Sequence, residues 1–312
     1  MERSLNGGFL LHLAKSLKSK IIELVIYMQN TNIKKINISV ISDAVETLCI
    51  ESNCYLNDDI TRSLNANLGL EPSLIGRNII EQLIENADIS RSCKTPICQD
   101  TGMAVVFVEV GQNVYIEGGS LTEAITQGVR DGYKKGFLRT SVVSDPIERK
   151  NTGDNTPPII HYDILEGNAL KITVMPKGFG SENMSAVKML KPSDGIEGIK
   201  SFILETVKSA GPNPCPPIIV GVGIGGTMEK AAIISKKALL RPIDKYSTLP
   251  HIKELEIELL ESINMLGIGP AGLGGRLTAL GINIEVFPTH IAGLPVAVNI
   301  SCHVTRHACV TL

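Results

Sequence analysis

The sequence has no tryptophan, and aromatic residues make up only 4% of its 312 residues. Few side chains are therefore available to build a stacking surface for single-stranded nucleic acid. Lysine and arginine never form a run of five or more, and the formal net charge is −2. This charge balance argues against a strongly basic nucleic-acid-binding surface. No apolar run reaches ~18 residues, so the sequence predicts no membrane span.

The cysteines also lack the common spacings. There are seven of them, an odd number without regular intervals, and no C-x-x-C pair. This usage fits a reducing compartment better than a disulfide framework, and it predicts a cytoplasmic protein. A zinc site is a weaker alternative. His303 and His307 stand four residues apart, but no acidic partner of a zincin helix lies between them.

Three cysteines occur in settings that differ from those of the other four. Cys98 lies in a Pro-Ile-Cys-Gln-Asp-Thr-Gly segment, Cys215 stands between two prolines, and Cys302 precedes a histidine. Three separate thiolates suit a cubane iron–sulfur cluster in which one iron has no protein ligand, an arrangement typical of a catalytic metal site. The alternative is that each cysteine is a small buried hydrophobe, as Cys49 is expected to be on its apolar helical stripe.

The apolar periodicity predicts an α+β fold in which helices outnumber strands. The expected helices include a capping box at Ser120 and a glycine stop at Gly211. The expected turn at 166–168 closes a hairpin between two strands. The predicted helices cover 41–49, 74–84, 120–136, 194–210, 227–240 and 252–265; the predicted strands cover 104–108, 159–165, 170–175, 218–220, 284–287 and 296–300.

The first 27 residues form a segment of their own. Apolar residues recur at helical spacing from Leu10 to Val25, with lysines between them, which predicts an amphipathic packing helix. A transit peptide and a true start at Met28 remain alternatives. The sequence thus predicts an N-terminal extension or helix at 1–27 and one domain at 28–312.

The glycine pattern at Gly221–Gly226 matches G-x-G-x-x-G between a predicted strand and a predicted helix. A dinucleotide fingerprint requires this context, so an NAD-dependent oxidoreductase is one hypothesis. Asp244, however, lies in a loop-like stretch rather than at the end of a second strand. The rival hypothesis is that the same backbone N–H groups bind a carboxylate or lie close to a cluster.

Four segments together resemble a known family. They are Ile97–Gly102, Lys177–Asn183, Cys215–Pro217 and Leu266–Pro270, and they look like the iron–sulfur hydro-lyases, which comprise the class I fumarate hydratases and L-tartrate dehydratases. The resemblance is to the α subunit, or N-terminal half, of these enzymes. It implies a fold like the N-terminal domain of class I fumarases, and a β subunit in a heterotetramer or larger assembly.

The resemblance also implies a site. Cys98, Cys215 and Cys302 would hold a 4Fe–4S cluster, and Asp100 and His290 would be catalytic. The substrate is expected to be a four-carbon dicarboxylate. An arginine fork suits such a substrate, and an Asp–His pair can manage the proton of a metal-bound hydroxyl. The residues expected to line its pocket are Gln99, Arg139 and Gly180.

Two segments, Ser141–Pro146 and Ser181–Asn183, look more like the fumarase branch than the tartrate branch. The sequence therefore predicts reversible hydration of fumarate to malate, with tartrate dehydration to oxaloacetate as the alternative. An electron carrier is a hypothesis from another class. It needs four closely spaced cysteine ligands, which Cys93 and Cys98 alone do not supply.

Overall fold

The computed structural model describes Lys18 and residues 33–312. The helix expected between Leu10 and Val25, and with it the interpretation of residues 1–27, lies outside the described residues apart from Lys18. The elements in chain order are β1 (Lys34–Asn37), α2 (Ile38–Cys54), α3 (Asp58–Leu68), α4 (Leu74–Cys93), β2 (Met103–Gly111), β3 (Val114–Glu117), α5 (Leu121–Lys135), β4 (Ile159–Leu165), β5 (Leu170–Lys177), α6 (Phe179–Glu182), β6 (Ala186–Leu190), η1 (Pro192–Asp194), α7 (Gly195–Ala210), β7 (Ile218–Gly225), α8 (Met228–Ala238), α9 (Pro250–Asn264), η2 (Pro270–Gly272), β8 (Ala279–Phe287), β9 (Leu294–Ser301) and β10 (Ala308–Thr311).

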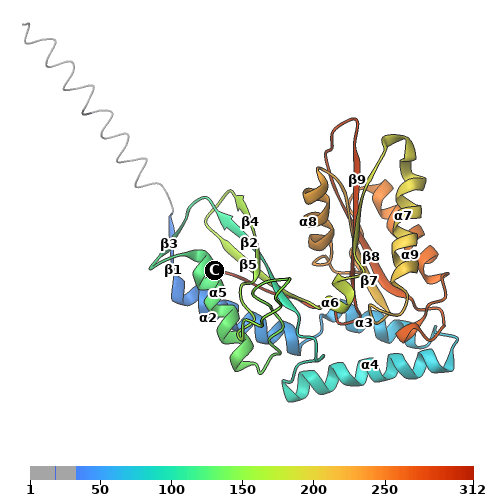
Figure 1. Ribbon diagram of the computed structural model, residues 1–312, viewed down its shortest axis with the longest axis horizontal. Coiled ribbons are helices and arrows are strands. Elements are labelled where there is room, and N and C mark those ends of the chain that lie inside the picture. Colours follow the sequence, from blue (N-terminus) through green and yellow to red (C-terminus); the bar gives the residue numbers. More distant parts are fainter. Residues whose placement is uncertain (1–17, 19–32) are drawn as a thin grey trace, which may run out of the picture.

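The strands form two four-stranded sheets and one short parallel pair. The first sheet has the order β10-β5-β2-β4, the second has the order β6-β9-β7-β8, and β1 pairs with β3. Figure 1 shows the two sheets side by side, with α2 and α5 beside the first, and with α3 and α4 running below. Mixed sheets with helices packed against them confirm the predicted α+β class.

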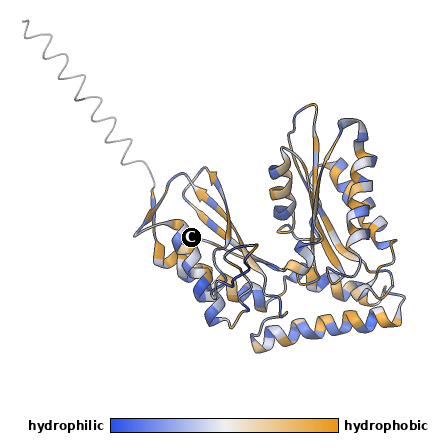
Figure 2. Cartoon of the chain, viewed as in Figure 1, coloured by the Kyte–Doolittle hydropathy of each residue, from blue (hydrophilic) through white to orange (hydrophobic). Residues whose placement is uncertain are grey.

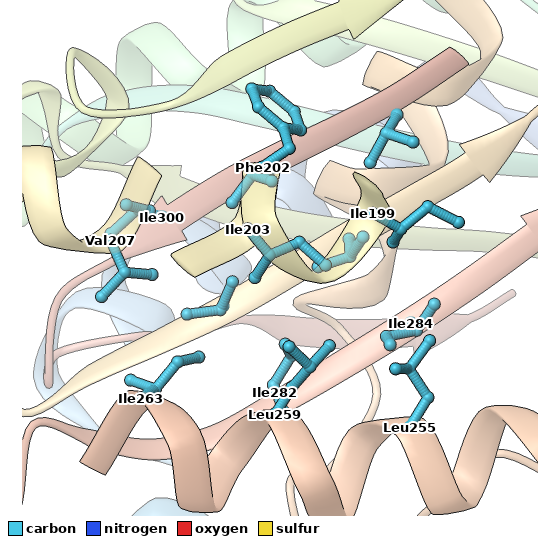
Figure 3. Close-up of a cluster of buried hydrophobic side chains, with 14 of the residues drawn as sticks. Ile199, Phe202, Ile203, Val207, Leu255, Leu259, Ile263, Ile282, Ile284 and Ile300 are labelled. Carbon is cyan, nitrogen blue, oxygen red and sulfur yellow. The ribbon is translucent and has the colours of Figure 1, made fainter. Parts of the chain in front are cut away.

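Each sheet has its own apolar core. In the second sheet, α7 and α9 cover one face, where Ile203, Leu259 and Ile282 meet (Figure 3). In the first sheet, α2 and α5 pack on β2 and β5. A third cluster joins the sheets, because Phe107 of β2 and Ile219 of β7 belong to the same group of buried side chains. Figure 2 shows apolar residues along the strands and mixed faces on the outer helices. Within the described residues, no helix is both long enough and apolar enough to cross a membrane.

The predicted helix beginning at Ser120 is confirmed. The Ser120 side chain accepts a hydrogen bond from Glu123 N, and Gly136 follows the last residue of α5. The glycine stop of α7 is also confirmed, because Gly211 is its C-cap with a φ of 52°. At this φ, a glycine carries none of the steric strain that a side chain would cause.

The predicted hairpin between β4 and β5 is wrong. β2 lies between these strands, pairing parallel with β4 and antiparallel with β5. The turn at 166–168 bonds instead to the turn between β2 and β3, since Asn113 N donates to Gly167 O at 2.9 Å. β2 is almost continuously apolar and buried, which suits a central strand, whereas β4 leaves Ile164 exposed and lies at the sheet edge.

The glycine pattern at Gly221–Gly226 is not a loop. β7 continues through Gly225, and all eight of its residues are buried. A Cβ on Gly221 would lie 2.2 Å from Ser235 O, and one on Gly223 would lie 2.1 Å from Ala231 O. The glycines therefore let α8 pack directly against the strand backbone. The hypothesis that this segment forms a nucleotide-binding loop is wrong.

Candidate active site

Cys98 lies on the loop between α4 and β2 (residues 94–102, the Cys98 loop). Its Sγ accepts a hydrogen bond from Asp100 N at 3.4 Å, and the exposed Gln99 brings its Oε1 to 3.6 Å from the same sulfur. The Asp100 carboxylate is held at both oxygens: Gly102 N donates to Oδ1, and Phe179 N donates to Oδ2, each at 3.0 Å. The loop thus fixes a thiol and a carboxylate next to each other.

Gly178 and Gly180, at the start of α6, lie between the Cys98 loop and the segment that carries Cys215. A Cβ on Gly178 would lie 3.0 Å from Asp100 Oδ2, and one on Gly180 would lie 3.8 Å from Asn213 O. Gly180 is exposed, so its backbone is open to a small molecule. The predicted substrate-contacting position therefore lies between Asp100 and the segment that carries Cys215.

Cys215 lies on the Pro-rich segment before β7 (residues 211–217, the Cys215 loop). It has a positive φ of 54°, which is rare for a residue with a side chain and points to a constrained position. Ala271 N donates to Pro216 O at 2.8 Å, and Gly272 packs against Pro212. The glycine-rich segment 267–275 therefore supports the Cys215 loop.

Cys302 lies at the end of β9, at the start of a turn (residues 302–307, the Cys302 turn). Ser301 pairs with Ile219 of β7, so the antiparallel strands bring Cys302 to the end of the sheet where Cys215 lies. His303 Nδ1 makes a hydrogen bond of 3.0 Å to Cys215 O. Burial raises the pKa of the Cys302 thiol.

The three predicted cysteines are therefore neighbours. Burial raises the pKa of the Cys215 thiol, and the nearby Cys98 raises it further. Cys98 also raises the pKa of Cys302, so it lies close to both. Of the other cysteines, Cys49 is fully buried in the apolar core, as expected, and Cys93 is exposed at the end of α4.

Arg139 lies beside the Cys98 loop. Its backbone O accepts a hydrogen bond from Thr101 Oγ1 at 3.1 Å, and its side chain is exposed. The guanidinium is therefore free to meet a ligand from the side of the loop. The surrounding segment is held in place by Asn155, whose Oδ1 accepts hydrogen bonds from Ser141 N and Val142 N.

The structure does not bring His290 to the cysteines. It lies in the turn after β8, where Ala292 N donates to its Nδ1 at 3.2 Å. β7 and β8 are parallel, and Cys215 precedes β7 whereas His290 follows β8. Eight residues of strand span about 25 Å. The predicted Asp100–His290 pair is therefore absent within the described part of this chain, because the two residues lie toward opposite ends of the second sheet.

Sequence reasoning missed two buried cations next to Cys302. Lys177 is only 2% exposed, and its Nζ donates to Ile300 O and Ser181 Oγ, both at 2.9 Å. Burial lowers the pKa of Lys177 to about 8. Arg306 is 3% exposed and donates to Asp100 O at 2.8 Å. Arg306 contacts Asn53 and Asp100, and Lys177 contacts Ile300, and these partners are far away along the chain, so no local pattern marked either cation. Lys177 does stand within a segment that carried the family resemblance.

Comparison with known proteins shows the family of this chain. The sequence model of the family described as "Fumarate hydratase (Fumerase)" matches residues 42–311. This chain belongs to the fumarate hydratase family. It is therefore a hydro-lyase, as predicted.

Two relatives illustrate the similarity. A protein of Methanocaldococcus jannaschii, provisionally named L(+)-tartrate dehydratase subunit alpha, is 46% identical over 274 residues, covering 86% of this chain and 96% of that protein. The L(+)-tartrate dehydratase subunit alpha of Escherichia coli K12 is 33% identical over 283 residues, covering 89% of this chain and 93% of that protein.

Proposed function

We propose that this chain is the α subunit of an iron–sulfur hydro-lyase that removes water from a four-carbon hydroxy-dicarboxylate, with L(+)-tartrate as the first candidate substrate. The observation that carries the proposal is the convergence of the Cys98 loop, the Cys215 loop and the Cys302 turn beside the fixed carboxylate of Asp100. The catalytic domain would comprise residues 28–312.

The cysteines fit a cluster better than a single ion. Within residues 33–312, no group of three or more His, Cys, Asp or Glu side chains is arranged around one ion position. A cubane places each thiolate on a different iron, so its ligands stand farther apart than those of a single ion. We therefore assign Cys98, Cys215 and Cys302 as ligands of a 4Fe–4S cluster. Its fourth iron would supply a Lewis acid to the departing hydroxyl group.

The chain's own side chains would bind and orient the substrate. Asp100 keeps lone pairs on both carboxylate oxygens after accepting its two backbone hydrogen bonds, so it can receive or return the proton of the hydroxyl group. The exposed Arg139 fork can pair with one substrate carboxylate. Gln99 and the backbone at Gly180 border the same space and would orient the substrate.

Tartrate replaces fumarate as the first candidate because the relatives described above are named as tartrate dehydratase subunits. Two of the residues that had favoured fumarate, Ser181 and Glu182, have internal partners. Glu182 forms ion pairs with Lys177 and Lys236, and Ser181 accepts a hydrogen bond from Lys177. Because these side chains support the fold, they carry little information about the substrate. Fumarate hydration remains the second candidate.

A β subunit would complete this site. The names of the relatives as α subunits support such a partner. Gln99, Cys215 and Arg139 are exposed in this chain, whereas charge stabilisation requires the exclusion of water. The residue that removes the carbon-bound proton would then come from the partner. All seven cysteines are free thiols, which suits a reducing cytoplasm.

The test is anaerobic co-purification of the chain with its β partner, reconstitution with iron and sulfide, and measurement of kcat/KM on L(+)-tartrate, fumarate and malate. We expect the largest value on L(+)-tartrate, and loss of turnover when the cluster is removed. A preference for fumarate would overturn the substrate assignment. Full turnover by protein without iron would overturn the cluster chemistry.

A further inference from the structure

Arg306 is a buried cation without an anionic partner. Its side chain lies in the Cys302 turn, four residues after the proposed ligand, and the residue is 3% exposed. Throughout residues 33–312, no aspartate or glutamate forms an ion pair with it. Taking an arginine out of water costs several kcal/mol unless an opposite charge lies nearby. The burial of Arg306 therefore indicates that an anion belongs beside it.

The hydrogen bonds of Arg306 do not supply that anion. Its Nη2 donates to Asp100 O at 2.8 Å and to Asn53 Oδ1 at 3.0 Å, and its Nη1 donates to Val304 O at 3.2 Å. These acceptors are all neutral. The Nε atom is buried and has no hydrogen-bond partner among the residues that the structure describes. Buried polar atoms rarely lack a partner, so this nitrogen marks a place where something else belongs.

Lys177 adds to the excess of positive charge on the same side. Lys177 and the half-buried Lys236 share one carboxylate, that of Glu182, so this group of three carries one unmatched positive charge. Lys177 also holds the chain near Cys302, since its Nζ donates to Ile300 O.

We infer that Arg306 is a positioning residue that provides the counter-charge for the thiolate-bound cluster and holds the Cys98 loop to the Cys302 turn. This inference rests on the proposed function. Three thiolates bring negative charge into a partly buried site. A fixed cation beside them offsets the free-energy cost of holding that charge away from water. The reduction potential of an iron–sulfur cluster depends on charge, hydrogen bonding and solvent exposure around it. Removing the cation would therefore make the potential more negative and weaken cluster binding.

The experiment uses the αβ complex, loaded anaerobically, and compares three variants with the unmodified chain. Arg306→Gln removes the charge, Arg306→Lys keeps it, and Asn53→Asp neutralises it while leaving Arg306 in place. The measurements are iron and sulfide per chain, the cluster reduction potential followed by EPR, and KM for the substrate. Arg241→Met is a matched control, because Arg241 is a largely buried arginine with two carboxylate partners, Glu256 and Glu285.

We expect the reduction potential and the iron content to depend on the net charge at Arg306 and Asn53. Arg306→Gln and Asn53→Asp should shift the potential in the negative direction and weaken iron binding on the order of 10-fold. Arg306→Lys should keep a potential close to that of the unmodified chain, and Arg241→Met should lose stability without a shift in potential. Because Asn53→Asp keeps the arginine, the test does not depend on the folding of Arg306→Gln.

Three outcomes would overturn the inference. Equal shifts in Arg306→Lys and Arg306→Gln would show that Arg306 is only a structural clamp. A higher KM with unchanged iron content and potential would assign the missing anion to the substrate. If all three variants kept the iron content, reduction potential and KM of the unmodified chain, Arg306 would have no role at the cluster. If the unmodified complex itself takes up no cluster, the proposed function fails first, and this result is distinguishable from the others.

Discussion

At the scale of single residues, position in the fold distinguishes the cysteines that we propose as ligands from the others. Cys93 and Cys98 are five residues apart, yet Cys93 ends α4 on the surface, whereas the Cys98 sulfur accepts a hydrogen bond from the backbone beside a fixed carboxylate. We predict that Cys98→Ser abolishes cluster binding and that Cys93→Ser leaves it intact. Iron and sulfide per chain, measured after identical reconstitution, decide the matter. Equal iron loss in both variants would refute the ligand assignment.

A second residue-scale prediction concerns the buried ion pair between Arg241 and Glu256. Glu256 is fully buried, and it also accepts hydrogen bonds from Ser247 N and Ile284 N. The Arg241→Met substitution leaves the buried carboxylate of Glu256 without a cation. We expect this to lower the free energy of unfolding by about 3–5 kcal/mol. Urea denaturation measures this loss. Arg62→Met, at an exposed pair with Asp244, is the control and should change it by no more than about 1 kcal/mol. Similar effects in both variants would contradict this account.

The sequence revealed the three cysteines and Asp100 because unusual neighbours and a family resemblance marked them. It misplaced His290, since no local pattern tells at which end of a sheet a turn will lie. It also missed Arg306, because this arginine is placed at the site by contacts with Asn53 and Asp100, which are distant along the chain. The residues proposed for the site could thus be named from the sequence, whereas the charges around them became visible only in the fold.

At the scale of elements, the hydrophobic pattern predicted most helices and the main strands correctly, but it did not predict their pairing. The hairpin error at β4 and β5 arose because two neighbouring strands can each pair with a third, more buried strand. The glycine pattern was misread for a related reason. Glycine permits both a tight loop and a close approach of two backbones, and only the position of α8 distinguishes them.

The packing of α8 on β7 gives an element-scale prediction. Gly223→Ala would place a methyl group 2.1 Å from Ala231 O, so α8 must move away from the strand. We expect a loss of about 1–3 kcal/mol in unfolding free energy. Gly69→Ala is the control, because Gly69 has a φ of −76° and open space around it, and it should change stability by less than about 1 kcal/mol. Stability of Gly223→Ala equal to that of the control would show that the helix does not pack on this strand backbone.

At the scale of the whole molecule, two sheets meet at the place where the three cysteine-bearing segments converge. The Cys98 loop leads into the first sheet, while Cys215 and Cys302 flank β7 and β9 of the second sheet. Lys177 and Arg306 hold these parts together through Ile300 and Asp100. We propose that the exposed side of this junction, with Gln99 and Arg139, is half of a binding site that a partner would close.

The most direct test of this account is a titration of the cluster-loaded α chain with its β partner under anaerobic conditions, with L(+)-tartrate turnover as the readout. Cluster content is held fixed throughout. We predict negligible turnover without β, and a rise that saturates at a fixed α-to-β ratio. Substantial turnover by the α chain alone would show that the site is complete within these 312 residues, and it would contradict the proposal that the active site is shared between two chains.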